Sequence, residues 1–342
     1  MIRLWIMVKT IRSDSVRPRI SIFVFLLSLG SAFLSTSLWA SQDIALGDSV
    51  AQLGLVAKPN GPGDSAETER YLGKTNIELC AEKNREFVTL GGVKVYLSGA
   101  IRSYRGNLTV QSNDYYKVLL PILWRTESPT RSIKRIVIDP GHGGKDPGKM
   151  CSIYRTCEKQ LTLDTALRLK AILEKNGYEV LLTREKDFWL DLDDRPAFAT
   201  RAKADLFVSL HYNAAGATDF TSSGIETYTY TPVGQSSTND TSRKRGLSAS
   251  QPGNNYDAFN TVLAWSVHRR LIANTGANDR GVRRAKFAVL RTLNCPGILV
   301  EGGFVSSRAE GALINDAAYR QKIAQSVAEG IMDYRQRVQG RP

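Results

Sequence analysis

Histidine and cysteine are scarce in this chain of 342 residues, which has three histidines and four cysteines. The four cysteines lack the paired C-x-x-C spacing of a closed structural zinc site, so a zinc finger is excluded. They are Cys80, Cys151, Cys157 and Cys295. Any metal site therefore has to draw on the few histidines and on carboxylates.

The first forty residues contain almost no acidic side chains. Five basic residues and one acid precede the stretch Ile20–Ala40, which carries no charge. A basic flank followed by an apolar run is typical of a secretory signal, here with a cleavage site after Ala40. The uncharged run of 21 residues is also long enough to stay as a membrane anchor. We predict that residues 1–40 are a cleaved signal peptide, with an uncleaved anchor as the alternative.

Basic residues outnumber acidic ones in the remainder of the chain. Without the five basic residues and the one acid of 1–40, the net charge of +13 falls to +9. This charge favours an anionic partner surface such as a cell wall, a membrane face or nucleic acid, although many exported proteins are simply basic. No RNA- or DNA-binding motif accompanies the charge, so no nucleic-acid partner is predicted.

Residues 41–127 are expected to form a small β-rich module. The stretch 85–110 alternates apolar and polar residues around Gly91-Gly92 and Arg105-Gly106, as hairpin strands do. The turn-rich segment 126–132 then marks a domain boundary. Wall binding and simple stabilisation are both open as roles for this module.

From residue 133 onward, strand patterns and helix patterns alternate, which predicts a second domain over 133–338. Strands are expected at 133–140, 178–184, 205–213, 224–230 and 297–304, and helices at 161–175, 194–202, 257–275 and 319–338. This order predicts an α/β fold with a twisted, largely parallel sheet and helices on both faces. The polar stretch 234–256 interrupts the order and is expected to be a long surface loop.

Three of the predicted strands end in polar residues that could meet at one edge of the sheet. They are followed by or contain His142, His211 and Glu301, and ligands of open α/β sheets bind outside the carboxyl ends of strands. A catalytic zinc takes three protein ligands, and Glu158, at the start of the helix after the first strand, would complete a His₂Glu set. Glu301, left at a buried strand end, needs a partner or a task. Taking a proton from attacking water and returning it to the leaving amine is such a task.

Each of these residues also has a purely structural interpretation. The histidines could be hydrogen-bonded core residues, Glu158 could simply favour the start of a helix, and Glu301 could pair with an arginine. His268 lies mid-helix beside arginines and is expected at the surface or the core edge. Arg284 and Lys286, near a predicted turn, are expected on a solvated basic face, with substrate carboxylates as the alternative partners.

Five stretches identify a family when they are taken together and in order. They are "IVIDPGHGGKDPG", the stretch from "EKQLTLD" to "VLLTRE", "RAKADLFVSLHYNA", "DRGVRRAKFAVLR" and "PGILVEGGFVSS". Over 133–338 the chain resembles the zinc-dependent N-acetylmuramoyl-L-alanine amidases, cell-wall hydrolases with a DPGHGG motif. The resemblance implies that His142, Glu158 and His211 bind one zinc ion and that Glu301 is catalytic. These are the four residues reached from the strand ends.

The implied reaction is hydrolysis of the amide between the lactyl group of N-acetylmuramic acid and L-alanine of the stem peptide. Zinc would polarise the carbonyl and activate water, and Glu301 would act as general base and then acid. Alternatives are another zinc hydrolase of wall polymers, a peptidase or deacetylase, or a non-catalytic wall-binding protein. The implied partner is peptidoglycan, with an activator protein as a further candidate partner. The implied location is the periplasm or cell envelope of a bacterium, with a membrane contact only through an uncleaved 1–40.

Two features depart from the family pattern. Cys151 and Cys157 flank the loop before Glu158, where a disulfide is permitted after export and two free thiols are the alternative. The 234–256 loop is longer than the family needs, and it could cover the cleft, touch glycan or be inert.

Overall fold

The computed structural model describes residues 43–48, 53–73, 76–124, 132–151, 154–216, 219–239 and 249–339. The predicted signal or anchor and the centre of the 234–256 loop lie outside these ranges. Among the described residues, no helix is long and apolar enough to cross a membrane.

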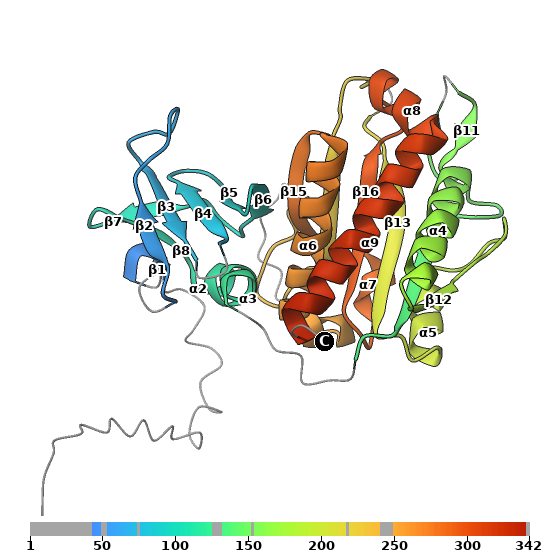
Figure 1. The fold of residues 1–342 in the computed structure, drawn as a ribbon, viewed down its shortest axis with the longest axis horizontal. Helices are drawn as coiled ribbons and strands as arrows, with labels where there is room; N and C mark the ends of the chain where they lie inside the picture. Colours follow the sequence, from blue (N-terminus) through green and yellow to red (C-terminus); the bar gives the residue numbers. More distant parts are fainter. Residues whose placement is uncertain are drawn as a thin grey trace, which may run out of the picture. The chain divides into compact units, whose positions relative to one another are not determined.

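One sheet of eleven strands runs through most of the described chain (Figure 1). Its order is β12-β9-β13-β16-β14-β15-β6-β5-β4-β3-β2. The strands of the second domain are β9 (Arg135–Pro140), β12 (Glu179–Leu182), β13 (Leu206–Asn213), β14 (Ile225–Tyr230), β15 (Asp279–Ala285) and β16 (Gly297–Phe304). They pair in parallel except for β14 with β16. The predicted largely parallel sheet is confirmed, and β15 is a strand that the sequence analysis missed.

Helices cover both faces of this part of the sheet, as predicted. The helices α4 (Glu158–Lys175), α6 (Asp257–Thr275) and α9 (Ala317–Gln339) pack on one face, and α5 (Asp194–Arg201) and α7 (Ala288–Arg291) pack on the other. The side chains of β9 point alternately toward the helices on one face of the sheet and toward those on the other. Ile136 and Ile138 belong to the core beneath α4, whereas Val137 belongs to the core with Ala199 of α5. Side chains of a strand alternate between faces, so a run of apolar residues is needed where both faces are covered.

The β-rich module has the predicted hairpins. The strands β5 (Phe87–Leu90) and β6 (Val93–Tyr96) pair antiparallel across Gly91 and Gly92, which have φ values of 56° and 87°. The strands β7 (Arg102–Tyr104) and β8 (Asn107–Gln111) pair across Arg105 and Gly106, again with positive φ. Two consecutive positive φ values are what a two-residue hairpin turn requires.

The module continues the sheet of the second domain, which the sequence did not predict. Antiparallel neighbours of β6 extend outward through β5, β4 (Glu78–Glu82), β3 (Thr68–Leu72) and β2 (Val56–Lys58), and a smaller sheet holds β1 (Asp43–Ala45), β8 and β7. The junction is a parallel pairing of Val95 in β6 with Val282 in β15. Trp265 of α6 also donates from Nε1 to the carbonyl of Leu90 at 2.9 Å. The two predicted ranges therefore share one sheet.

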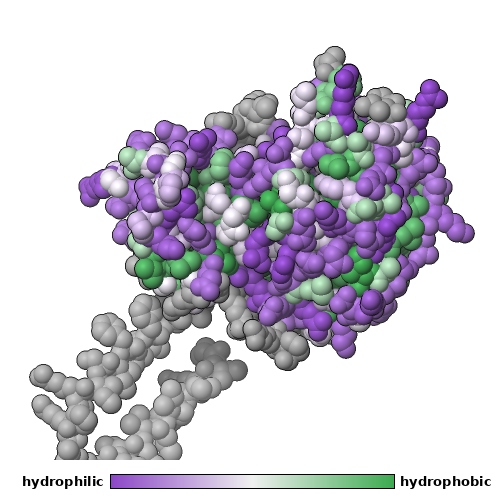
Figure 2. All heavy atoms as spheres, turned by 45° about the horizontal axis from the view of Figure 1, so that its top comes forward, coloured by the Kyte–Doolittle hydropathy of each residue, from purple (hydrophilic) through white to green (hydrophobic). Residues whose placement is uncertain are grey.

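The remaining helical segments are short. They are α2 (Ser112–Asp114), a π-helical turn (Tyr115–Leu119), α3 (Leu120–Leu123), a 3₁₀ helix (Pro252–Tyr256) and α8 (Arg308–Asn315), and the strands β10 (Met150–Cys151) and β11 (Thr156–Cys157) form a hairpin before α4. The 3₁₀ helix and the buried side chain of Gln235 show that the ends of the 234–256 stretch are packed rather than open loop. Hydrophilic residues dominate the face of the molecule seen in Figure 2, with hydrophobic residues in small groups between them.

Candidate metal centre

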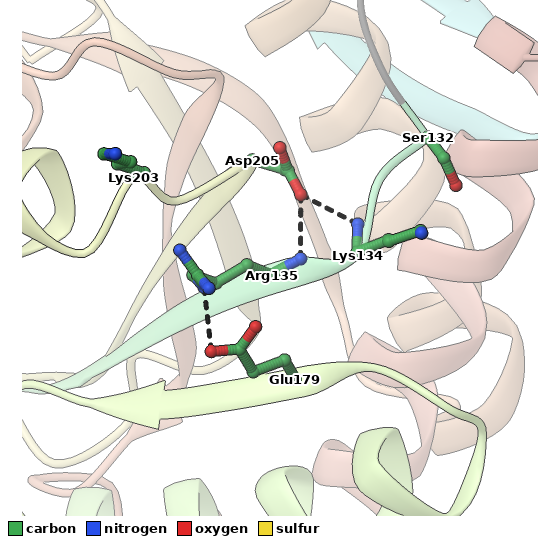
Figure 3. A pocket seen from close by; sticks show the side chains of 6 residues that line it. All are labelled: Ser132, Lys134, Arg135, Glu179, Lys203 and Asp205. Carbon is green, nitrogen blue, oxygen red and sulfur yellow. Dashed lines mark hydrogen bonds and ion pairs between the residues drawn. The ribbon is translucent and has the colours of Figure 1, made fainter.

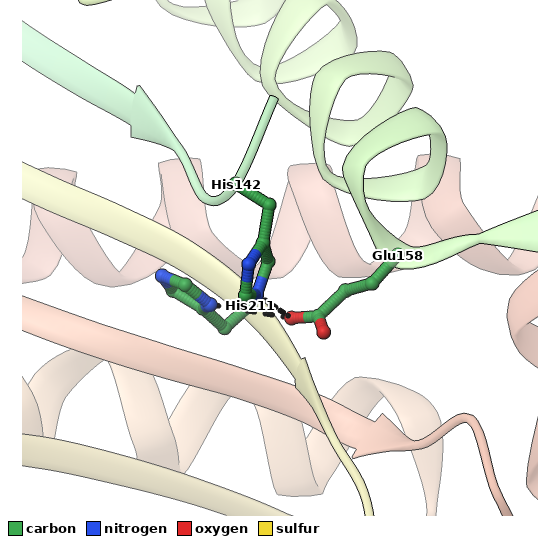
Figure 4. Close-up of side chains that lie close together, drawn as sticks. All are labelled: His142, Glu158 and His211. Atoms are coloured by element: carbon green, nitrogen blue, oxygen red, sulfur yellow. Dashed lines mark hydrogen bonds and ion pairs between the residues drawn. The ribbon is translucent and has the colours of Figure 1, made fainter. Parts of the chain in front are cut away.

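The structure brings His142, Glu158 and His211 together (Figure 4). His142 follows β9, Glu158 is the first residue of α4, and His211 lies near the end of β13. One ligand atom from each residue lies within 4.8 Å of the others. Glu158 Oε1 is 3.0 Å from His142 Nε2 and 3.2 Å from His211 Nδ1. The side chains converge as predicted from the strand ends.

Glycines let these side chains approach each other. A Cβ atom on Gly141 would lie 2.3 Å from Cε1 and 2.6 Å from Nδ1 of His211, so the imidazole occupies the space where a side chain would be. A Cβ atom on Gly148 would lie 2.7 Å from Glu158 Oε2 and 2.7 Å from His142 Cδ2. Glycine has no Cβ and permits such close approach. The glycines around His142 are therefore required by the side chains of the site.

Hydrogen bonds from outside the triad fix its orientation. Asp146 Oδ2 is 2.7 Å from His142 Nδ1, which leaves Nε2 of that ring directed at Glu158. The carboxylate of Glu158 accepts from the backbone N–H of Tyr212 at Oε1 and of Lys149 at Oε2, both at 3.0 Å. Metal-ligating histidines commonly bond a carboxylate through their other nitrogen, and this partner fixes the ring. Asp146 was not predicted, although it lies within the same glycine-rich motif.

The donor set fits a zinc ion. Ligands about 2.0–2.1 Å from a tetrahedral metal are about 3.3 Å apart, close to the two distances from Glu158 Oε1. Burial alone would raise the pKa of Glu158, but hydrogen bonds and charge from His142 and His211 outweigh it and hold the pKa well below its usual range. Burial lowers the pKa of His142, and the Glu158 and Asp146 carboxylates reverse this and raise it. Glu158 is therefore held in the ionised form that a metal ligand requires.

Glu301 lies beside this triad on β16. Its Cα is paired with that of His211 on β13 and with that of Glu226 on β14. Directly paired residues of neighbouring strands share a face of the sheet. Glu301 Oε2 is buried and has no hydrogen-bond partner among the described residues, and no described arginine forms an ion pair with it. Burial first, and then the charges of Glu158 and Glu226, raise the pKa of Glu301 well above its usual range.

The carboxylate of Glu226 is a neighbour of Glu301 that the sequence analysis missed. It is buried and accepts from Asn213 Nδ2 at 2.8 Å, from the Tyr228 hydroxyl at 2.7 Å and from Arg280 Nε at 2.8 Å. Three donors compensate its charge, unlike that of Glu301. A signal was present in the sequence, because a glutamate stands between apolar and aromatic residues in "GIETYTY".

Two secondary expectations were wrong. His268 is fully buried rather than at the surface, with Thr227 Oγ1 3.0 Å from Nδ1 and Asp279 Oδ1 2.9 Å from Nε2. Arg284 is buried rather than solvated and donates to the carbonyl of Tyr96 at 2.8 Å and of Ser236 at 2.9 Å. Neither contributes to the metal centre.

Cys157 is a free cysteine among the described residues, and the side chain of its proposed disulfide partner, Cys151, is not among those described. In the β10–β11 hairpin the backbone of Cys157 is paired with Met150, and that of Cys151 with Thr156. This register favours the free-thiol alternative for Cys157.

A separate cavity of about 390 Å³ lies at the opposite edge of the sheet (Figure 3). Part of its charged lining is paired: Arg135 forms an ion pair with Glu179, and Asp205 accepts from the backbone N–H of Lys134 and Arg135. The side chains of Lys134 and Lys203 also line it.

A His₂Glu donor set at the carboxyl edge of an α/β sheet, with a poorly compensated carboxylate beside it, defines the class of metal-dependent hydrolases. The model of one such family, described as N-acetylmuramoyl-L-alanine amidase, matches residues 136–333. The chain belongs to this family. The matched range contains all four candidate residues.

Relatives and solved structures agree with the family. An uncharacterized cell wall amidase of Bacillus anthracis is 34% identical over 208 residues, which cover 59% of this chain and 35% of the relative. A probable cell wall amidase of Staphylococcus saprophyticus is 27% identical over 274 residues, covering 79% of this chain and 76% of the relative. The structure of an N-acetylmuramoyl-L-alanine amidase of Nostoc punctiforme is 32% identical with a TM-score of 0.50, covering 61% of this chain and all of that chain. The chain therefore spans about a third of the first of these relatives and about three-quarters of the second.

Proposed function

We propose that this chain is a zinc-dependent amidase that cuts peptidoglycan between N-acetylmuramic acid and L-alanine of the stem peptide. The observation that carries the proposal is the convergence of His142, Glu158 and His211 beside Glu301 in a chain of this family. We propose that the first three hold one zinc ion. When bound, zinc supplies Lewis acidity to the scissile carbonyl and to water.

The protein's own residues handle the proton. Glu301 Oε2, with no hydrogen-bond partner among the described residues, is available to accept the proton of the attacking water. The water oxygen bonds to the lactyl carbonyl carbon, and Glu301 then returns the proton to the amide nitrogen. The C–N bond breaks, which frees the amino terminus of L-alanine and leaves a lactyl carboxylate.

The orientation of the triad depends on its surroundings. Asp146 holds the imidazole of His142, and the Tyr212 and Lys149 amides hold the carboxylate of Glu158. These contacts hold the donor atoms in place before a metal binds. This matters because tight binding requires ligand positions that are kept within a few tenths of an ångström.

A peptidase or deacetylase of wall polymers could use the same donor set, and the bond that is cut distinguishes these activities. A non-catalytic wall-binding protein would keep the fold without needing a poorly compensated Glu301. We further propose that the protein is exported to the periplasm or cell envelope. We also propose that residues 41–127 form a separate module and that residues 133–338 form the catalytic domain. An activator protein is a proposed partner.

The test is digestion of isolated peptidoglycan by purified residues 41–342, with and without a chelator, followed by mass spectrometry of the new ends. The proposal predicts free L-alanine amino termini and peptide-free glycan, lost on chelation and restored by zinc. Glu301→Gln should bind zinc and lose turnover. Cleavage at any other bond would contradict the amidase assignment, and turnover by Glu301→Gln would contradict its role.

A further inference from the structure

A short segment from Asp187 to Leu190, here called the aromatic segment, lies against the glycine-rich loop that carries His142. A Cβ atom on Gly143 would be 2.3 Å from the Phe188 carbonyl oxygen, and one on Gly144 would be 2.4 Å from the Trp189 nitrogen. The two backbones are therefore in direct contact.

Polar bonds hold the aromatic segment in this position at both of its ends. Asp187 accepts from the Gly144 N–H at 2.7 Å and from Lys159 Nζ at 2.7 Å. Arg195 Nη2 donates to the carbonyl of His142 at 3.0 Å and to that of Leu190 at 3.1 Å. The side chain of Arg195 is 2% exposed, and the two hydrogen bonds that it makes here are partly buried. A ligand on the aromatic segment would thus sit at a fixed position relative to the metal centre.

The aromatic segment nevertheless leaves its rings in solvent. Phe188 is 44% exposed and Trp189 is 36% exposed. Exposing large apolar side chains forgoes about 25 cal/mol for each Å² that could have been buried. Exposed aromatic groups held in place beside a reaction centre are typical of a binding surface.

The surroundings of Trp189 indicate which kind of ligand fits. Its Nε1 donates to Asp191 Oδ1 at 3.1 Å, and Lys145 Nζ lies over one face of the ring, 4.5 Å from its centroid. A pyranose ring matches this arrangement, because its C–H face can stack on the face of the indole opposite Lys145 while its hydroxyl and acetamido groups reach charged side chains around the ring. The exposed carboxylates of Asp191 and Asp194 disfavour a peptide that carries free carboxylates.

We propose that Phe188 and Trp189 form a glycan subsite, which stacks a sugar of the peptidoglycan strand other than the one bearing the cleaved amide. This inference rests on the proposed function for the identity of the polymer. It assigns the glycan to the side of the metal centre where the aromatic segment lies.

The test compares wild type, Trp189→Ala, Trp189→Phe and the control Trp124→Ala on substrates of one, two and four disaccharide units with stem peptides. Trp124 is 51% exposed and follows α3, so it controls for the loss of a solvent-facing tryptophan. For Trp189→Ala we expect KM on the four-disaccharide substrate to rise about tenfold with little change in kcat. The effect should shrink as the strand shortens, and Trp189→Phe should restore most of the affinity. Equal losses at every length, or no loss, would overturn the subsite.

A binding measurement separates failure of the subsite from failure of the proposed function. Peptide-free glycan strands lack the amide between N-acetylmuramic acid and L-alanine, and their affinity for full-length protein can be measured by calorimetry. The proposal expects weaker binding by Trp189→Ala than by wild type and Trp124→Ala. If wild type cuts no amide, this comparison still decides the subsite, and equal binding by all three proteins would refute it.

Discussion

A methyl group added at Gly141 should weaken zinc binding without unfolding the protein. The new Cβ would lie 2.3 Å from His211 Cε1, 2.5 Å from Nε2 and 2.6 Å from Nδ1. Ordinary contact begins at 3.4 Å, so the imidazole has to retreat by about 1 Å. That displacement is several times the tolerance of about 0.2 Å in a metal–ligand distance.

The backbone at Gly141 can accept alanine. Gly141 is not among the residues with positive φ, and its N–H donates to the carbonyl of Leu210 at 3.0 Å, a bond that alanine also makes. The clash involves only the end of a rotatable side chain. We therefore expect Gly141→Ala to cost at most about 1–3 kcal/mol of unfolding free energy without metal. Zinc affinity should fall about 10–100-fold, the range seen when ligand orientation is disturbed.

The assay is competition for zinc between the protein and a chromophoric chelator, with urea unfolding of the zinc-free protein in parallel. Gly216→Ala is the matched control, because a Cβ there meets nothing within 4 Å and its φ is not positive. It should bind zinc as wild type does. Unchanged zinc affinity in Gly141→Ala would show that His211 is not a ligand or that its position is not critical.

Three further predictions concern charges. The raised pKa of Glu301 means that the zinc-free folded state holds this proton more tightly than the unfolded chain, whose value is about 4.3. The free energy of unfolding of the wild type therefore falls as pH rises from about 4.3 through the pKa of Glu301 in the folded state. Glu301→Gln should melt at a higher temperature than the wild type at pH 8 but not at pH 4. An equal difference in melting temperature at both pH values would refute this. Asp146→Asn should weaken zinc binding about tenfold in the chelator assay, and wild-type affinity would refute the role of Asp146. Arg284→Met should cost at least about 2 kcal/mol in urea unfolding, unlike Arg102→Met, whose side chain is 72% exposed; equal stability of the two variants would contradict the burial argument.

The positions of the four candidate residues could be predicted because they depend on element order and direction. His142 follows the end of β9, His211 lies near the end of β13, and Glu158 opens a helix. Glu301 lies inside β16 rather than at its end. In a parallel sheet the carboxyl ends of strands meet at one edge, so placement along the chain already implies proximity.

The partners of these residues could not be predicted, since they depend on distances between side chains. Nothing in the order of elements says that His142 Nδ1 points at Asp146, or that three donors compensate Glu226. Nor does it say that Glu301 Oε2 finds no hydrogen-bond partner among the described residues. The burial of His268 has the same origin: its partner Asp279 lies on β15, a strand with too many charged residues to be recognised from hydrophobic periodicity.

The contact between the β-rich module and the second domain also could not be predicted from the sequence. Composition marked a boundary at 126–132, but the pairing of Val95 with Val282 and the bonds of Arg284 to Tyr96 depend on residues far apart in the chain. Strand pairing of this kind fixes the register of distant segments and has no local sequence signal.

The glycine-rich loop after β9 contacts both proposed sites, the metal centre and the glycan subsite. Gly141 and Gly148 make room for His211, Glu158 and His142, whereas Gly143 and Gly144 make room for the backbone of the aromatic segment. A side chain at either of the latter two positions would meet backbone atoms, which cannot rotate away. A substitution at Gly144 should therefore displace Trp189 together with the loop that carries His142. The positions of the metal centre and the glycan subsite then both depend on this one turn. Changing the distance between the two sites would require changes in the glycine-rich loop and in the aromatic segment at once.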